Sequence, residues 1–261
     1  MCTLSLSAQS FAVETENLGL RILPCPKSVS IDGQFNDWDL TGGIFVCGDV
    51  ETQREQCSAW FHAMYDPHNL YVLVRWIDPT PMNNPGSVKG SNGFNGDCLQ
   101  FRLITGHGES ERVSHWTCWR DADGQDAATV EYGKKFNEGH ADLLTSGGTQ
   151  AFAKNADGRG YVQEIAIPWK MLTRNGSSLS AGDKVQVTVE LNFTLTGGGR
   201  LTIKDCFKAG VSPDRVFTFM TSGCWGTGTL EASGNVAPSP VRLSDTREFP
   251  VTLQNGLHSM D

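Results

Sequence analysis

The segment Trp60–Ile77 reads WFHAMYDPHNLYVLVRWI, in which two apolar runs flank the turn-forming residues DPHN. Successive side chains of a strand point to opposite faces, so the second run presents Val72, Val74 and Trp76 on one face. This face is wholly apolar, and we expect it to lie in the core. The segment therefore predicts a β-hairpin, with one strand over 59–65 and the other over 70–77.

Similar short runs, rich in Val, Ile, Thr and aromatic residues, recur along the chain, and none keeps helical spacing for more than about two turns. We expect strands at Gly43–Cys47, Ala59–Tyr65, Leu70–Ile77, Cys98–Ile104, Val113–Arg120, Thr149–Ala153, Tyr161–Ile167, Lys184–Thr194 and Arg215–Phe219. Pro168 should end one of them, because proline cannot donate to a ladder, and WKML after it should form at most one helical turn. The pattern predicts an all-β fold: an antiparallel β-sandwich of about ten strands, immunoglobulin-like or jelly-roll-like, with few short helical turns.

The composition excludes several classes of protein. The chain has 261 residues, 21 basic and 29 acidic, so its formal net charge is −8. An acidic chain without a basic run is poorly suited to binding nucleic acid. No apolar stretch approaches the roughly 20 residues of a membrane-spanning helix. Hydrophobic residues make up 39 %, enough to fill a core, so the composition does not indicate disorder.

Eight cysteines are present, with no CxxC or CxxCH motif. This argues against a zinc ribbon, a thioredoxin-type motif and covalently attached c-type haem. An even number of cysteines in a lysine-poor, strand-rich chain favours an oxidising compartment, and Cys47 and Cys57, on either side of a polar loop, are the expected disulfide. The alternative, buried free thiols, fits Cys98 and Cys118 equally well.

The chain divides into three parts by pattern. Residues 1–28 are expected to be an N-terminal extension, whose first residues, MCTLSLSAQSFAVE, are similar to the tail of a secretory signal but lack a basic start. Residues 29–232 should form the sandwich, and residues 233–261 a C-terminal strand and tail. Together with the cysteines, the N-terminus leads us to expect an extracellular or periplasmic protein.

Five segments follow one another in an order that resembles the family 9 carbohydrate-binding modules and the wider DOMON-like superfamily. They are IDGQFNDWD (Ile31–Asp39), YDPHNLYVLVRWIDPTP (Tyr65–Pro81), GDCLQFRL (Gly96–Leu103), GYVQEIAIPWKML (Gly160–Leu172) and AGDKVQVTVELNF (Ala181–Phe193). The resemblance runs from about Ile31 to Trp225. It implies a single β-sandwich that binds sugars between aromatic rings, with calcium nearby.

A sugar site needs flat aromatic rings beside planar hydrogen-bonding groups. Trp76 and Trp169 fit core positions, and Trp38 should plug one end of the sandwich. Trp116 and Trp119 in HWTCWRDADGQD lie three residues apart and face opposite sides of a strand, so one of them should be exposed or line a groove. We expect the ligand-binding residues to be Trp119 and Trp225 as the stacking pair, Arg120 and His115 as polar partners, and Trp116. Packing at a sheet edge is the alternative for both rings of the pair.

Calcium is expected in the turn DADGQD, where Asp121, Asp123 and Asp126 offer three carboxylates, although the turn does not have the EF-hand pattern. An acidic hairpin turn without metal is the alternative. Carboxylates also occur at strand ends and could bind calcium or cap turns, namely Asp32, Asp37, Asp78 and Asp97.

The segment VRWIDPTPM (Val74–Met82) also resembles a second branch of the superfamily, the haem-binding gamma subunit of ethylbenzene and dimethylsulfide dehydrogenases. That resemblance implies a b-type haem held by Met and Lys, with electron transfer within a larger redox complex. Met82 is the candidate methionine ligand. Candidates for the other ligand are Lys134, Lys135, Lys204 and Lys208, with His115 as a substitute.

Catalytic motifs are missing from the sequence: the six histidines show no HExxH spacing, and there is no GxSxG, Walker A or GxGxxG. We therefore expect no enzyme, but a non-catalytic, secreted domain that binds a polysaccharide or oligosaccharide. Haem binding is the first alternative. A surface scaffold or adhesion domain, associated with a larger enzyme, is the second.

Overall fold

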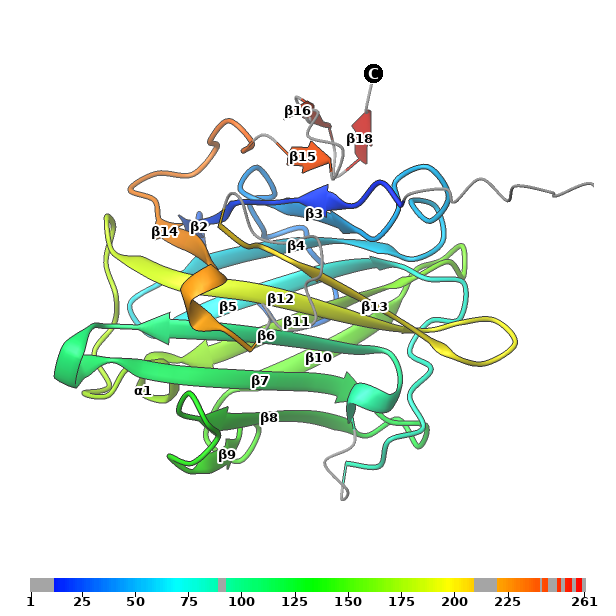
Figure 1. Cartoon of the computed structure of the whole chain (residues 1–261). Helices are drawn as coiled ribbons and strands as arrows, with labels where there is room; N and C mark the ends of the chain where they lie inside the picture. Colours follow the sequence, from blue (N-terminus) through cyan, green and yellow to red (C-terminus); the bar gives the residue numbers. More distant parts are fainter. Residues whose placement is uncertain are drawn as a thin grey trace, which may run out of the picture.

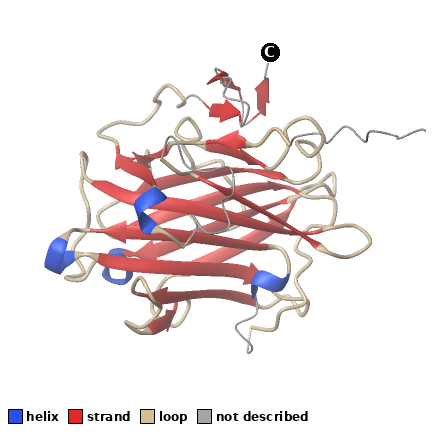
Figure 2. Cartoon of the chain, viewed as in Figure 1, coloured by secondary structure: helices blue, strands red, loops and turns tan. Residues whose placement is uncertain are grey.

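Strands make up most of the molecule, as the computed structural model shows for residues 12–88, 93–208, 220–239 and 241–243, and for the backbone of 248–249, 252–254 and 257–259 (Figures 1 and 2). The described helical elements are the single turn α1 (Trp169–Leu172) and the 3-10 turns η1 (Gly93–Asn95), η2 (Gly108–Ser110) and η3 (Ser222–Cys224). None of these is long and apolar enough to cross a lipid bilayer. The expected all-β fold is confirmed.

Thirteen strands belong to one sheet. They are β2 (Gly19–Pro24), β3 (Ile44–Cys47), β4 (Ser58–Tyr65), β5 (Asn69–Ile77), β6 (Cys98–Thr105), β7 (Arg112–Arg120), β8 (Asp126–Tyr132), β9 (His140–Asp142), β10 (Thr149–Lys154), β11 (Tyr161–Pro168), β12 (Lys184–Thr194), β13 (Arg200–Asp205) and β14 (Gly226–Leu230). A smaller sheet joins β1 (Thr15–Glu16), β15 (Val241–Leu243) and β16 (Glu248–Phe249), and β17 (Thr252–Gln254) pairs with β18 (Leu257–Ser259).

The large sheet folds over on itself into two layers, with strand order β10-β11-β5-β4-β2-β14-β12-β6-β7-β8-β9. We call β3, β4, β5, β11 and β10 the back layer, and β13, β12, β6, β7, β8 and β9 the front layer (Figure 1). β2 lies at the fold and pairs in parallel with both β4 and β14, whereas the other pairings are antiparallel. A sandwich made this way needs few exposed sheet edges.

Between the layers lies the main core, which confirms the expected inner face of the hairpin. Val72, Val74 and Trp76 belong to it, and Trp76 packs on Tyr161 and Phe193 at ring-centroid distances of 5.1 Å each. Trp169 is also buried there, as expected. Full burial of each such side chain contributes about 1.5–3 kcal/mol to folding.

Eight of the nine expected strands are present within one residue at either end, and the ninth, Arg215–Phe219, lies outside the described residues. The expected 1–28 extension is wrong in part, because β2 lies inside it and pairs in the large sheet. Of that extension, residues 1–11 lie outside the described part. Strand β14, GTGTL, was missed because its two glycines carry no side chain to mark an alternation.

Glu164 fixes the outer cover of the back layer. Its carboxylate lies on β11, is wholly buried, and accepts hydrogen bonds from the backbone N–H groups of Asp32 (3.0 Å) and Gly33 (2.5 Å). The Trp38 indole N–H donates the third, at 2.7 Å. Burial raises the pKa of Glu164, and these three donors oppose that rise. One carboxylate thereby clamps the segment 31–38 over the sheet.

Trp38 is structural, as expected, but it does not plug an end of the sandwich. It packs with Leu23, Met64 and Leu73 on the outer face of the back layer. That layer is therefore buried on both faces, which explains why the side chains of β5 from Leu70 to Ile77 are hydrophobic on both sides except at Arg75.

The expected disulfide between Cys47 and Cys57 is wrong, because both are free thiols. Cys47 pairs with Ser58 across β3 and β4, so Cys57 lies one residue out of register. Cys47 consequently packs in an outer cluster with Phe45 and Trp60, whereas Cys57 faces the main core. A one-residue offset turns the two side chains to opposite faces of the sheet. The alternative, buried free thiols, holds for Cys98 and Cys118.

Asp78 and Asp97 form a buried acidic pair where β5 and β12 end and β6 begins. Asp97 accepts from the backbone N–H groups of Thr194 and Asn83, both at 2.6 Å, and Asp78 accepts from that of Thr80 at 2.8 Å. Both residues therefore cap turns, one of the two roles expected of them. The second carboxylate oxygen of Asp78 is buried, and a hydrogen bond joins the Asp78 carboxyl to that of Asp97. Burial and the neighbouring Asp78 raise the pKa of Asp97 to about 8, so the pair holds a proton at neutral pH.

Replacing Glu164 with Ala should lower the free energy of unfolding by about 2–4 kcal/mol, because three buried donors lose their acceptor. Urea denaturation measures this change. Asn36→Ala, an exposed residue in the same clamped segment, should change stability by no more than about 0.5 kcal/mol. Equal effects of the two substitutions would show that Glu164 is no anchor.

Asp78→Asn should reduce the loss of stability at high pH. The folded state keeps the shared proton up to about pH 8, whereas an unfolded aspartate releases it near pH 3.9, so folding binds protons in this window. Stability therefore falls as the pH rises through the window. An amide at position 78 can donate to Asp97 without titrating, so the variant should lose less between about pH 5 and about pH 9 in urea denaturation. Asp32→Asn, at an exposed aspartate, serves as control, and equal slopes for wild type and Asp78→Asn would contradict the shared proton.

Candidate functional site

The three tryptophans expected to bind sugar are buried. Trp119 is 0 % exposed and Trp225 is 1 % exposed, and Trp116 stacks on Phe101 in the main core at 5.8 Å. The expectation of an exposed stacking pair is therefore wrong. Trp116 and Trp119 do face opposite sides of β7, but the outer side is covered at Trp119.

Local packing explains the burial of Trp119 and Trp225. The Trp119 indole donates to the carbonyl of Gly86 at 2.9 Å, and Gly93 lies so close that a Cβ there would come within 2.4 Å of the ring. Trp225 packs instead with Ile104, Val113 and Phe207. The two rings belong to separate hydrophobic clusters, so they cannot stack together on one ligand.

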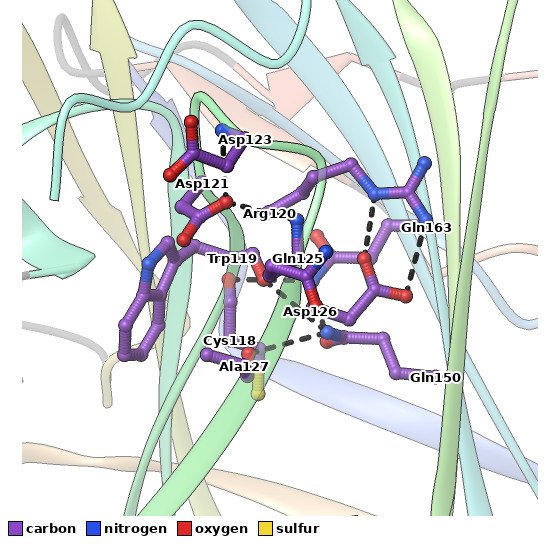
Figure 3. A network of polar contacts seen from close by, with 10 residues as sticks. All are labelled: Cys118, Trp119, Arg120, Asp121, Asp123, Gln125, Asp126, Ala127, Gln150 and Gln163. Carbon is purple, nitrogen blue, oxygen red and sulfur yellow. Dashed lines mark hydrogen bonds and ion pairs between the residues drawn. The ribbon is translucent and has the colours of Figure 1, made fainter. Parts of the chain in front are cut away.

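Figure 3 shows the DADGQD turn, where calcium was expected. One carboxylate oxygen of Asp121 accepts from the backbone N–H groups of Asp123 (3.0 Å) and Gln125 (2.8 Å), which closes the turn. Asp126 forms a two-pronged ion pair with Arg120, at 2.6 and 3.1 Å. The carboxylates of Asp121 and Asp126 therefore serve separate structural tasks. No three His, Cys, Asp or Glu side chains come together as a metal site within the described part of the chain.

Two glutamines beside this turn join the layers (Figure 3). Gln150 on β10 donates to the carbonyl of Ala127 at 3.2 Å, and Gln163 on β11 donates to that of Cys118 at 3.3 Å. Gln163 also accepts from the Trp76 indole at 3.2 Å. Arg120 faces this interior, its guanidinium 5.1 Å from the Phe152 ring, so it has a structural role rather than the expected ligand contact.

The residues expected to hold haem are engaged elsewhere. Met82 packs against the main core. Lys134 pairs with Glu111 at 2.8 Å and Lys204 with Glu190 at 3.3 Å. The three cavities with volumes of about 400, 440 and 350 Å³ are lined by neither Met82 nor a candidate lysine.

Polar side chains instead gather on the outer face of the front layer, in two rows that cross it from strand to strand. Alternation places Leu99, Phe101 and Val189 in the core, so their neighbours in sequence point outward. The first row is Lys204, Glu190, Gln100, Thr117, Thr129 and Asp142, on β13, β12, β6, β7, β8 and β9. The second row is Thr188, Arg102, His115, Glu131 and His140. We call these two rows, with Asn192 and Thr202, the polar face.

Hydrogen bonds connect the polar face across its strands. Gln100 donates to Thr117 at 3.0 Å, and Asn192 lies within 3.5 Å of both Gln100 and Glu190. Thr202 donates to Asn192 at 2.6 Å. Such a network fixes the orientation of amide and carboxylate groups before any ligand arrives, which lowers the entropy lost on binding.

In the second row, Arg102 and His115 form a fixed pair. Their side-chain nitrogens are 2.6 Å apart, and the other ring nitrogen of His115 lies 2.9 Å from the Gly133 carbonyl. Arginine can only donate, so His115 accepts at Nδ1 and donates from Nε2. Burial and Arg102 lower the pKa of His115 to about 4, so the ring is neutral at neutral pH. His115 is the one expected ligand residue that the structure places on the polar face.

Two partly exposed aromatic rings belong to segments next to this face. Phe94 on η1 is 43 % exposed, and its carbonyl accepts a hydrogen bond from Arg200 at the start of β13. Phe136 is 37 % exposed and lies 4.3 Å from the His115 ring.

Sequence reasoning missed Phe94, Gln100, Glu190 and Asn192. A signal was present in Lys184–Thr194, KVQVTVELNFT, where polar residues alternate with apolar ones. The neighbouring strands continue the alternation, and strand order was needed to see that their polar residues meet.

Comparison with known structures shows the same fold. A family 9 carbohydrate-binding module from Caldicellulosiruptor kristjanssonii in complex with cellotriose matches with a TM-score of 0.52 and 17 % identity, over 85 % of this chain and 98 % of that one. A family 9 module from the same organism in complex with glucose gives 0.51 and 18 %, over 83 % and 98 %. A putative carbohydrate-binding protein from Bacteroides uniformis gives 0.50 and 12 %, over 82 % and 99 %.

Sequence comparison gives the family. No match was found among curated proteins. The family model described as "Carbohydrate family 9 binding domain-like" matches residues 31–231, most of the chain and nearly the same span as the order of motifs indicated. The chain therefore belongs to the carbohydrate family 9 binding domain-like family.

Proposed function

We propose that the chain is a non-catalytic domain that binds the chain end or a short stretch of a glucose-based oligosaccharide at the polar face. The observation that carries this proposal is the hydrogen-bonded network of Gln100 and Thr117, which are partly exposed, over the buried side chains of Glu190 and Asn192. The segment η1, which contacts β6 and β7, carries the exposed ring of Phe94 beside it. Sugar hydroxyls need planar groups that donate and accept, and the apolar sugar face needs an aromatic ring. The polar face offers both.

Family membership supports the ligand class, since two modules of similar fold were solved with cellotriose and with glucose. The aromatic contact in this proposal comes from Phe94 rather than from a pair of tryptophans. No metal takes part in it.

We infer that the domain acts outside the cytoplasm, because polysaccharides of this kind are found outside cells. The buried free cysteines do not argue for an oxidising compartment, so the inference rests on the ligand class alone. Absence of reducing ends released from cello-oligosaccharides would accord with a non-catalytic role.

Cellotriose should bind the wild-type chain in isothermal titration calorimetry, and Phe94→Ala combined with Gln100→Ala should weaken it about 30-fold. Losing one hydrogen bond and one ring contact removes about 2 kcal/mol, and 1.4 kcal/mol is about tenfold. Gln34→Ala, an exposed glutamine over the back layer, is the matched control and should bind normally.

Equal binding by the double variant would refute the polar face as the site. Silence of the wild-type chain toward glucose, cellotriose and other neutral glycans would refute sugar binding and favour the scaffold or adhesion alternative.

A further inference from the structure

A cavity of about 400 Å³ opens on the outer face of the back layer, on the other side of the molecule from the polar face. Its walls are the loop before β4, which carries Arg54 and Glu55, and the β10–β11 turn, which carries Asn155 and Arg159. Arg75 on β5 lines it from the sheet. Three arginines thus line one cavity in a chain whose net charge is −8.

Arg75 lies in a gap of the cover over this layer. Its cross-strand neighbours are Trp60 on β4 and Val162 on β11, which belong to two separate apolar clusters. Its guanidinium carbon is 4.5 Å from the centre of the Phe35 ring. The side chain is therefore held against the aromatic ring at the wall of the cavity.

No carboxylate neutralises this guanidinium. Among the described residues, none forms an ion pair or hydrogen bond with it, and its Nη1 atom is buried without a partner. Burial lowers the pKa of Arg75, and no acidic group counteracts that effect. An arginine stays charged in proteins, and leaving a partly buried charge unpaired is costly.

The two acidic residues that line the cavity, Glu55 and Asp157, make contacts with groups other than Arg75. The Glu55 side chain is 75 % exposed and only 3.6 Å from the Nε atom of Arg54. Asp157 accepts from the backbone N–H of Arg159 at 2.8 Å and so caps the β10–β11 turn. Arg159 reaches back across the cavity to the carbonyl of Glu55 at 2.7 Å, which ties the two walls together.

A second cavity of about 440 Å³ shares Phe35, Asn155 and Val162 with the first and adds Lys154. The two cavities are therefore adjacent, and the first alone is large enough for a ring-sized organic molecule. Its chemistry is an aromatic wall, an amide and a set of cations. Guanidinium groups bind carboxylate and sulfate through paired hydrogen bonds, so an oxyanion supplies what Arg75 lacks.

We propose that this space, which we call the Arg75 pocket, is a second ligand site that takes an oxyanion carried on a sugar-sized molecule, as a carboxylate or a sulfate ester. Arg75 forms the central ion pair, Arg54 and Arg159 flank it, and Phe35 packs on the ligand's carbon skeleton. The inference does not rest on the neutral-sugar site, because the two lie on opposite layers.

Calorimetry with glucuronate, glucose 6-sulfate, inorganic sulfate and glucose tests the proposal. The two acidic sugars should bind and glucose should not bind here, as the ¹⁵N shift of the Arg75 Nε–H reports directly. Tighter binding of glucuronate would identify the ligand group as a carboxylate, and tighter binding of glucose 6-sulfate would identify it as a sulfate ester. If inorganic sulfate bound as tightly as both acidic sugars, the pocket would recognise only a free anion, which would contradict the proposal.

Arg75→Met replaces the guanidinium with a shorter, unbranched apolar side chain and removes an unpaired, partly buried charge, so it should fold and be at least as stable as wild type without ligand. Its affinity for the acidic sugars should fall at least about tenfold, about 1.4 kcal/mol. Arg112→Met, at an arginine stacked on Tyr132 outside the pocket, is the matched control. Undiminished binding by Arg75→Met, or no binding of either acidic sugar to wild type, would overturn the proposal.

Discussion

The buried carboxylate of Glu164 is the interaction on which the rest of the structure depends. It joins the segment 31–38 to β11 through three hydrogen bonds and holds Trp38 over the back layer. With that cover in place, the back layer is buried on both faces, whereas the front layer carries a row of polar side chains on its outer face. The same cover has a gap at Arg75, and the Arg75 pocket opens at this gap.

In the front layer, the pairing register of the strands determines where the polar side chains lie. Six strands align so that polar side chains from distant parts of the sequence stand in two rows, and hydrogen bonds between them fix their orientation. A shift of any strand by one residue would turn its polar side chains into the core. The burial of Leu99, Phe101 and Val189 therefore holds the polar face in place.

Much of the fold could be predicted from the sequence, because alternation and turn residues are local properties. The strand Lys184–Thr194 was predicted to the residue, and the hairpin around DPHN nearly so. The site could not be predicted this way, since it depends on which strands become neighbours. Trp119 was expected on the surface because strand alternation placed it outward, but only the tertiary structure shows that η1 covers it. Likewise, only the β3–β4 register turns Cys47 and Cys57 apart.

Sugar recognition by an ordered polar network with a phenylalanine beside it is the central claim, and the position of a bound sugar tests it most directly. A crystal structure of the complex with cellotriose should show the sugar on the front layer, with hydroxyls bonded to Gln100, Glu190 or Asn192 and one ring over Phe94. Cellotriose bound anywhere else on the chain, with these side chains unengaged, would contradict it.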